Sequence, residues 1–549
     1  MLDLSCFFFG CFALNICIGF DLTPHVCSLS LQQSAHQYDE CYGLAYAQQL
    51  KNKDIPEGGS KAVNLINVNG LSESGANFVM RKSVKAFTDT ILDLLVDTEE
   101  TKKQRVDFVG KRETLYLGPD EQVTPEDIEW IVKRAALRGY DTPNAFMSSK
   151  PKAGINHKEY GVTSEGVNIY LEVALRKALG INPTKDAFTI KMTGGPDGDV
   201  AGNEIKILIR EYGENAKIVG IADHSGCAED PRGLDHSELL RLVDKNLCIA
   251  NFRDIMLGEN GVVHHATDDE GVKARNNMHN RLEADAFVPA GGRPFTIDEH
   301  NYRSFLKADG SPSSPLIVEG ANLFITADAR QKLFDEAKVV IVKDSSANKG
   351  GVVTSSYEII AAMLCSDEEF NDNKEAITRE VLKKLKELAH LEAELLFREV
   401  DAYPGCALPE VSDIISNSIN AATDAITAAL KEMSKEDCDS LLPLFRAHLP
   451  PTLADMAFDR VSEVVPEQYI KGAIASCLAS KFVYKEGSKF VNSQPEDALA
   501  KVALRYAEKE QEMAKLNEVL QDTDIPHDEK ERIIALLDAG GARTALTMT

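Results

Sequence analysis

A glycine-rich turn between an apolar strand and an amphipathic helix constrains the fold of this chain more than any other feature. Residues 188–192 (FTIKM) are short, apolar and typical of a strand, and the glycine-rich run Thr193–Asn203 follows them directly. Apolar residues then recur at helical spacing over residues 205–212, and a second strand-like run, 217–222, ends at Asp223. The order strand, turn, helix, strand and acid predicts a βαβ unit of a Rossmann-type sheet.

The same order indicates what the turn binds. Glycines let backbone N–H groups approach a pyrophosphate at a helix N-terminus, and an acid at the next strand end accepts hydrogen bonds from an adenosine ribose. We therefore expect a dinucleotide site, with Asp223 favouring NAD over NADP because a carboxylate repels a 2′-phosphate. The spacing of Gly195, Gly198 and Ala201 is stretched by one residue, so an ordinary glycine-rich αβ turn remains the alternative.

Composition excludes several classes of function. The 549 residues are 44% hydrophobic and 27% charged, which predicts several globular domains. A net charge of −26 argues against nucleic acid or an anionic membrane as a partner. We expect no metal: the cysteines lack zinc spacing, and an EF-hand loop beginning at Asp197 would need oxygen ligands where Ala201 and Leu208 stand.

The N-terminal segment is unusual. The run from Cys6 to Phe20 is as apolar as the core of a signal peptide, but residues 1–50 contain no lysine or arginine, which secretory and mitochondrial leaders require. We expect residues 1–38 to be an atypical segment foreign to the rest of the chain, an anchor or a misassigned gene start, with a signal peptide as the less favoured alternative. The remainder is predicted to be reduced and intracellular, either cytoplasmic or mitochondrial.

Three regions follow along the chain. Residues 39–150 mix helices and short strands and are predicted to form a partial α/β substrate domain. Residues 151–360 alternate β-like runs with amphipathic helices, which predicts a doubly wound parallel sheet, the Rossmann-type NAD-binding domain. Its later strands, 316–318 and 339–342, end in polar turns at the edge where such sheets bind ligands. Residues 361–549 are predicted to be helical.

Two side chains are candidates for acid–base chemistry. Lys61 follows a tight turn with a proline and two glycines, and a lysine desolvated there can act as a base. Asp120 lies in a loop just before a helix, for which Thr124 and Asp127 predict a capping pair. The alternatives are a solvated surface lysine and an ordinary turn aspartate.

Four segments, taken in order, carry a resemblance to a known family. They are residues 51–61 (KNKDIPEGGSK), 118–121 (GPDE), 193–203 (TGGPDGDVAGN) and 347–356 (ANKGGVVTSS). The ordered set resembles the large NAD-specific glutamate dehydrogenases of microbes, in the glutamate/leucine/phenylalanine/valine dehydrogenase superfamily. The resemblance covers roughly residues 38–356, and less specifically the region around 484–487. It implies oxidative deamination of L-glutamate to 2-oxoglutarate and ammonium with reduction of NAD, by a homo-oligomer.

The resemblance also implies roles for individual residues. Lys61 would activate the water that attacks the iminium carbon, and Asp120 would move the proton to and from the substrate nitrogen. The implied substrate-side residues are Gly58, Asn348 and Ser355. The implied NAD-binding residues are Thr163, Gly195, Gly198, Asp199, Val200, Asp223 and Asn322.

One departure from the family concerns the distal carboxylate of glutamate. The family carries a basic segment of the type R-G-G-I-R upstream of the K-N-K-D-I-P run, and residues 1–50 offer no cation. Smaller amino-acid dehydrogenases place a lysine where this chain has Gln49, and Lys51 is the candidate substitute. The alternatives are therefore a dehydrogenase of another amino acid, or an NAD-binding relative that is catalytically impaired or regulatory.

Overall fold

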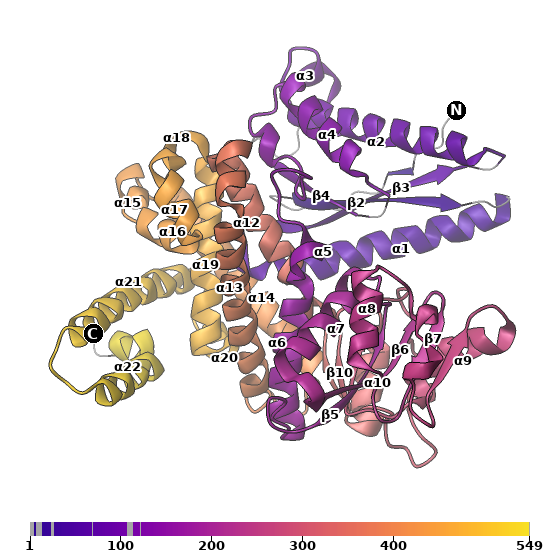
Figure 1. The fold of residues 1–549 in the computed structure, drawn as a ribbon. Coiled ribbons are helices and arrows are strands. Elements are labelled where there is room, and N and C mark those ends of the chain that lie inside the picture. Colours follow the sequence, from indigo (N-terminus) through magenta and orange to yellow (C-terminus); the bar gives the residue numbers. More distant parts are fainter. Residues whose placement is uncertain are drawn as a thin grey trace.

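The computed structural model describes residues 5–6, 14–23, 27–68, 70–106, 114–120 and 122–547. Three regions are visible in Figure 1: an N-terminal α/β layer, a domain built on a larger sheet, and a mass of helices at the C-terminal end. Of the helices in these ranges, none combines the length and apolar character that crossing a membrane requires. The seven cysteines whose side chains are described are free thiols.

The described residues of the N-terminal region contain a four-stranded sheet in the order β1-β3-β2-β4. Its strand β2 runs parallel to both β3 and β4, and β1 is antiparallel to β3. Helix α1 packs on β3 so closely that a Cβ on Gly59 would lie 2.1 Å from the backbone nitrogen of Gln49. The strands are β1 (Ser5–Cys6), β2 (Leu14–Thr23), β3 (Gly58–Asn67) and β4 (Leu115–Pro119), and the helices are α1 (Cys27–Lys51), α2 (Glu73–Leu95), α3 (Thr101–Gln104) and α4 (Pro125–Arg138).

The strand β2 belongs to the segment 1–38, which we expected to be foreign to the rest of the chain; that expectation stays a prediction. In the structure, β2 lies between β3, which carries Lys61, and β4, which ends just before Asp120. A run such as LNICIGF has the composition of a buried strand as well as that of a signal-peptide core, so composition does not separate the two. The expected boundary at residue 38 falls inside α1.

The larger sheet has seven strands in the order β11-β10-β9-β5-β6-β7-β8. The five strands from β11 to β6 pair in parallel, which confirms the predicted α/β class, whereas β7 runs antiparallel to both of its neighbours, β6 and β8. Only two residues separate β6 from β7, too few for the crossover that a parallel neighbour needs, so the sheet is mixed and not wholly parallel. The strands are β5 (Phe188–Thr193), β6 (Ala216–Asp223), β7 (Gly226–Glu229), β8 (Val262–His265), β9 (Ala286–Pro289), β10 (Leu316–Val318) and β11 (Val340–Val342).

Helices cover both faces of this sheet (Figure 1). The predicted helix after the glycine-rich turn is α7, and its apolar stripe buries Ile205, Leu208 and Tyr212. The helices of this region are α5 (His157–Tyr160), α6 (Val162–Leu179), α7 (Asp199–Tyr212), α8 (His236–Asp244), α9 (Asp269–Arg281), α10 (Ala327–Ala337), α11 (Asp344–Ala347) and α12 (Gly350–Leu364).

The C-terminal region is helical, as predicted. It shares one apolar core with the larger sheet, because Ile190 and Val288 of the sheet belong to the same buried cluster as Leu396 and Phe482. The expected boundary at residue 360 falls inside α12. The helices are α13 (Asp367–Glu399), α14 (Leu408–Glu432), α15 (Lys435–Asp439), α16 (Leu442–His448), α17 (Pro451–Ala457), α18 (Val461–Val464), α19 (Glu467–Glu486), α20 (Ser488–Asn492), α21 (Glu496–Gln521) and α22 (His527–Thr547).

Candidate active site

The two acid–base candidates form an ion pair. Lys61 lies on β3 opposite Cys17 of β2, and Gly118 of β4 lies opposite the same residue from the other side. This register brings Asp120, just beyond the end of β4, to the lysine, and the Lys61 ammonium contacts the Asp120 carboxylate. The Lys61 side chain is 5% exposed and that of Asp120 is 41% exposed, so the pair lies at the boundary between protein and solvent. The predicted cap of α4, formed by Thr124 and Asp127, is present.

The turn before Lys61 is held from two sides. The Asn52 amide donates to the Gly58 carbonyl at 2.8 Å. Glu57 accepts hydrogen bonds from the Ser356 hydroxyl at 3.1 Å and from the Tyr469 hydroxyl at 2.9 Å. Since Ser356 follows Ser355 in α12, these bonds bring the two predicted substrate-side positions, Gly58 and Ser355, to one part of the molecule.

Glu57 is a residue that sequence reasoning missed. It is buried, and burial raises its pKa to about 7 although the hydrogen bonds from Tyr469 and Ser356 act in the opposite direction. Its second oxygen, Oε2, has no hydrogen-bond partner within the described part of the chain. The only sequence signal was its position beside the glycine pair.

Three polar side chains meet at the end of β10. The Asn348 amide donates to the Asn322 side chain at 2.8 Å and to the Gly320 carbonyl at 3.1 Å. The ammonium of Lys51, at the end of α1, donates to the same Asn322 oxygen at 2.5 Å. The proposed substitute cation therefore lies beside two predicted site residues, whereas the Gln49 side chain accepts from the backbone N–H of Gly59.

The glycine-rich turn has the close approaches that a pyrophosphate site needs. Gly194 has φ +96°, and a Cβ there would lie 2.8 Å from the backbone nitrogen of Gly291. A Cβ on Gly195 would lie 2.4 Å from an oxygen of Asp223, so that carboxylate lies against the turn. Gly198 is the N-cap of α7, and Asp199 is its first residue. Sequence reasoning chose Gly195 and Gly198, but Gly194 is the glycine with positive φ.

The remaining predicted cofactor residues lie beside this turn. The Ser164 hydroxyl, next to Thr163 in α6, donates to the Val200 carbonyl at 2.8 Å. A Cβ on Gly320 would lie 3.2 Å from the Val200 side chain, and one on Gly351 would lie 3.3 Å from the Thr163 hydroxyl. These contacts join the turn to the segment that follows β10 and to the start of α12.

Polar and charged groups at the turn fit a dinucleotide. Thr193 Oγ1 and Asn348 Oδ1 are buried and, among the described residues, lack hydrogen-bond partners, so they remain available to a ligand. The Lys158 ammonium donates to the Asp197 carbonyl at 2.9 Å and provides a cation where Asp197 and Asp199 add negative charge. Asp197, Asp223 and His224 also lie close enough to share an ion, but they are half-buried or exposed groups of the same turn region.

A buried ionic network reaches this region from the C-terminal helices. The Lys349 ammonium contacts Asp54, Glu392 of α13 and Tyr484 of α19. Lys53 joins the network through Glu392, and the Tyr484 hydroxyl also donates to Asp54. Burial alone would raise the pKa of Glu392, but the Lys349 and Lys53 ammonium groups hold it at about 2. Sequence reasoning assigned these residues no role, although three of them lie within the segments that carry the family resemblance.

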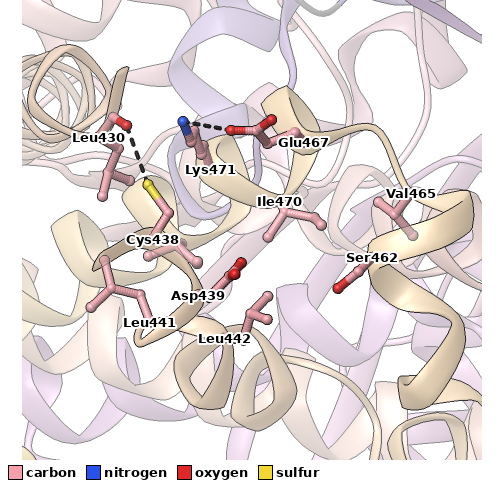
Figure 2. Close-up of a pocket in the computed structure, with 11 residues that line it drawn as sticks. Leu430, Cys438, Asp439, Leu441, Leu442, Ser462, Val465, Glu467, Ile470 and Lys471 are labelled. Atoms are coloured by element: carbon pink, nitrogen blue, oxygen red, sulfur yellow. Dashed lines mark hydrogen bonds and ion pairs between the residues drawn. The ribbon is translucent and has the colours of Figure 1, made fainter. Parts of the chain in front are cut away.

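A separate cavity of about 120 Å³ lies among the C-terminal helices (Figure 2). Apolar side chains such as Ile470 and Leu442 line it together with the ion pair between Lys471 and Glu467. None of the predicted site residues lines this cavity.

Comparison with known proteins identifies the family. Residues 154–402 match the family described as glutamate/leucine/phenylalanine/valine dehydrogenase. The NAD-specific glutamate dehydrogenase of Neurospora crassa is 36% identical over 487 residues, which cover 82% of this chain and 44% of that protein. The chain is a homologue of the large NAD-specific glutamate dehydrogenases. The enzyme of the same description from Saccharomyces cerevisiae is 34% identical over 83% of this chain and 43% of its own length, so this homologue spans less than half of these relatives.

Solved structures support the fold. A lysine-to-leucine mutant of glutamate dehydrogenase aligns with a TM-score of 0.51 at 17% identity, covering 74% of this chain and 79% of that one. A further structure described as glutamate dehydrogenase gives a TM-score of 0.50 over the same shares. At this level of identity the likeness concerns the fold alone, and it confirms the predicted fold class.

Proposed function

We propose that this homologue oxidises L-glutamate to 2-oxoglutarate and ammonium and reduces NAD. The observation that carries the proposal is the ion pair between Lys61 and Asp120, at the boundary of protein and solvent. A lysine and a carboxylate in contact can exchange a proton, which oxidative deamination requires at two different steps. The family match and the glycine-rich turn support the same proposal.

Proton transfer is the part that the chain itself performs. Asp120 takes a proton from the substrate ammonium, which leaves an amine that can expel a hydride from Cα. Bound NAD would accept that hydride. Lys61 releases its ammonium proton to solvent and, as the neutral amine, takes a proton from the water that attacks the iminium carbon. Asp120 returns the substrate proton to the nitrogen so that ammonia can leave, and then accepts the remaining hydroxyl proton of the added water and passes it to solvent. The oxygen of that water becomes the keto oxygen of 2-oxoglutarate.

The substrate carboxylates need cations or donors. The Lys51 ammonium donates to the same Asn322 oxygen as the Asn348 amide, and we assign Lys51 to a substrate carboxylate together with Asn348 and Ser355. Gly58 would offer its backbone. Gln49 is engaged with Gly59, which argues against it as the residue that holds a carboxylate.

NAD is the proposed cofactor, bound by the residues around the turn. Gly195, Gly198, Asp199 and Val200 would hold the pyrophosphate by backbone N–H groups at the start of α7. Asp223 would accept from the adenosine ribose. Thr163 and Asn322 would contact the nicotinamide end. A homo-oligomer and an intracellular location, cytoplasmic or mitochondrial, remain predictions.

The experiment is a substrate and cofactor panel with the purified chain. NADH formation is measured with L-glutamate, leucine, valine and phenylalanine, and with NADP in place of NAD. We expect glutamate with NAD to give the highest kcat/KM. Faster oxidation of another amino acid would replace the proposed substrate. Binding of NADH without turnover of any amino acid would favour a catalytically impaired relative.

A further inference from the structure

Five buried side chains from different regions of the chain form one ionic network. Each exposes 2% of its surface or less. The Glu392 carboxylate contacts two cations, with Oε1 2.6 Å from the Lys53 ammonium and Oε2 2.5 Å from the Lys349 ammonium. Two lysines and two carboxylates make the network neutral. Its members are Lys53, Asp54, Lys349, Glu392 and Tyr484.

The N-terminal side of this network adjoins the proposed substrate site. Lys53 and Asp54 belong to the short helix η1 (Asn52–Asp54), which follows Lys51 directly. The first residue of that helix, Asn52, donates to the Gly58 carbonyl. A shift of this helix would therefore move both the Lys51 ammonium and the turn that leads to Lys61.

The other side of the network adjoins Asn348. Lys349 is the next residue along the chain, and its ammonium also contacts Asp54 at 2.5 Å. Ser346, two residues before Asn348, donates to Glu392 at 2.5 Å. The loop that carries Asn348 is thus tied to α13 on both sides of the asparagine.

The C-terminal helices supply the members that join the two sides. Glu392 comes from α13 and binds one lysine from each side. The hydroxyl of Tyr484, from α19, donates to Asp54 at 2.7 Å and lies 3.0 Å from the Lys349 ammonium. Since apolar residues often stabilise a core as well as a buried ion pair does, stability alone does not account for this network. Hydrogen bonds have fixed directions, so the network can also hold the segments that it joins in one relative arrangement.

We propose that Glu392 and Tyr484 are positioning residues, through which the C-terminal helices set the places of Lys51 and Asn348 at the substrate site. This inference rests on the proposed function of that site. It makes the C-terminal helical region part of the catalytic unit. The network acts through other residues and does not itself touch the substrate.

The test compares two tyrosine-to-phenylalanine variants. Tyr484→Phe removes one hydroxyl from the network. Tyr403→Phe removes a hydroxyl that bonds Ser488 at 3.0 Å and that, among the described residues, makes no hydrogen bond to the network. We expect Tyr484→Phe to lower kcat/KM for glutamate about tenfold, the size of effect typical of hydrogen bonds to charged groups. Most of the loss should be in KM for glutamate, with KM for NAD nearly unchanged. Tyr403→Phe should match the wild type.

A measurement that does not depend on activity is amide hydrogen exchange of the whole protein. Tyr484→Phe should speed exchange in residues 343–350 and 50–55, while Tyr403→Phe should not. Glu392→Gln, with Glu399→Gln as the control on the same helix, should give the same pattern and a larger kinetic effect. Glu399 is also buried, and it bonds Ser488.

The outcomes separate this inference from the proposed function. A wild-type protein that oxidises no glutamate refutes the proposed function. An active wild type whose Tyr484→Phe variant matches the Tyr403→Phe variant in KM refutes the positioning role alone. Faster exchange in the two segments without a change in glutamate kinetics also refutes it, because the network would then be only structural.

Discussion

Replacing Asp223 by asparagine should change which dinucleotide the protein prefers. The carboxylate lies against the glycine-rich turn, since a Cβ on Gly195 would be 2.4 Å from its Oδ2. It also accepts from the backbone N–H groups of Ser225 and Ile249, each at 2.7 Å. These donors bond different carboxylate oxygens, so asparagine keeps an acceptor for one of them and removes the negative charge, which makes it a milder change than alanine.

The expected size follows from two terms. A hydrogen bond from a ribose hydroxyl to a carboxylate contributes about 1.5–3 kcal/mol, of which a neutral amide retains roughly half, so NAD should lose about 1 kcal/mol. Two unit charges about 4 Å apart repel by about 1 kcal/mol in water and about 4 kcal/mol near a protein surface, and NADP should regain part of this. The preference for NAD over NADP should therefore fall by about 2 kcal/mol or more, which is roughly thirtyfold.

The assay is kcat/KM for each dinucleotide at saturating glutamate. Asp230→Asn is the matched control, because Asp230 also accepts from two backbone N–H groups, those of Arg232 and Gly258, but lies beside Val219 toward the other end of β6. An unchanged NAD/NADP ratio in Asp223→Asn would refute the placement of the ribose at this carboxylate. The same ratio change in Asp230→Asn would show that loop stability, and not the ribose contact, controls the preference.

Three further predictions concern other parts of the site. Lys61→Met and Asp120→Asn should each lower kcat by about 10²–10⁴-fold, because proton transfer by a positioned side chain contributes that much to the rate. NADH binding, measured by fluorescence titration, should change little, and its loss would contradict a purely chemical role. Gly194→Ala should weaken NAD binding by at least about tenfold, because the new Cβ would meet the backbone at Gly291. The control is Gly310→Ala, which should bind NAD like the wild type because Gly310 also has a positive φ, +82°, but has open space around it. Glu57→Gln should raise the midpoint of thermal unfolding at pH 8 but not at pH 4. The Glu57 carboxyl, whose folded pKa is raised from 4.5 to about 7, contributes its full stability below pH 4.5, and about 3 kcal/mol of that stability is lost as the pH rises to 7. Glutamine does not titrate and loses none, so an equal difference in midpoint at both pH values would contradict this prediction.

Local patterns predicted much of the fold. The turn between β5 and α7 is encoded by neighbouring residues, and periodicity was enough to place it. The Lys61–Asp120 contact was expected only through the family resemblance, because it depends on a shared register with β2 and not on spacing along the chain.

Long-range pairing explains what the sequence did not predict. Lys53 and Glu392 are 339 residues apart, and no local signal connects them. The positive φ of Gly194 depends on how closely the chain approaches Gly291 from a different strand end. The antiparallel edge at β7 depends on a two-residue connection that resembles any other polar turn.

The most direct test of the account is the product balance of the wild-type chain with L-glutamate and NAD, alongside Lys61→Met. We predict that NADH, ammonium and 2-oxoglutarate form in equal amounts, and that the Lys61→Met variant forms almost none of them. Absence of NADH above the Lys61→Met background, from wild-type protein that binds NADH, would contradict the central claim that Lys61 and Asp120 form the acid–base pair of an amino-acid dehydrogenase.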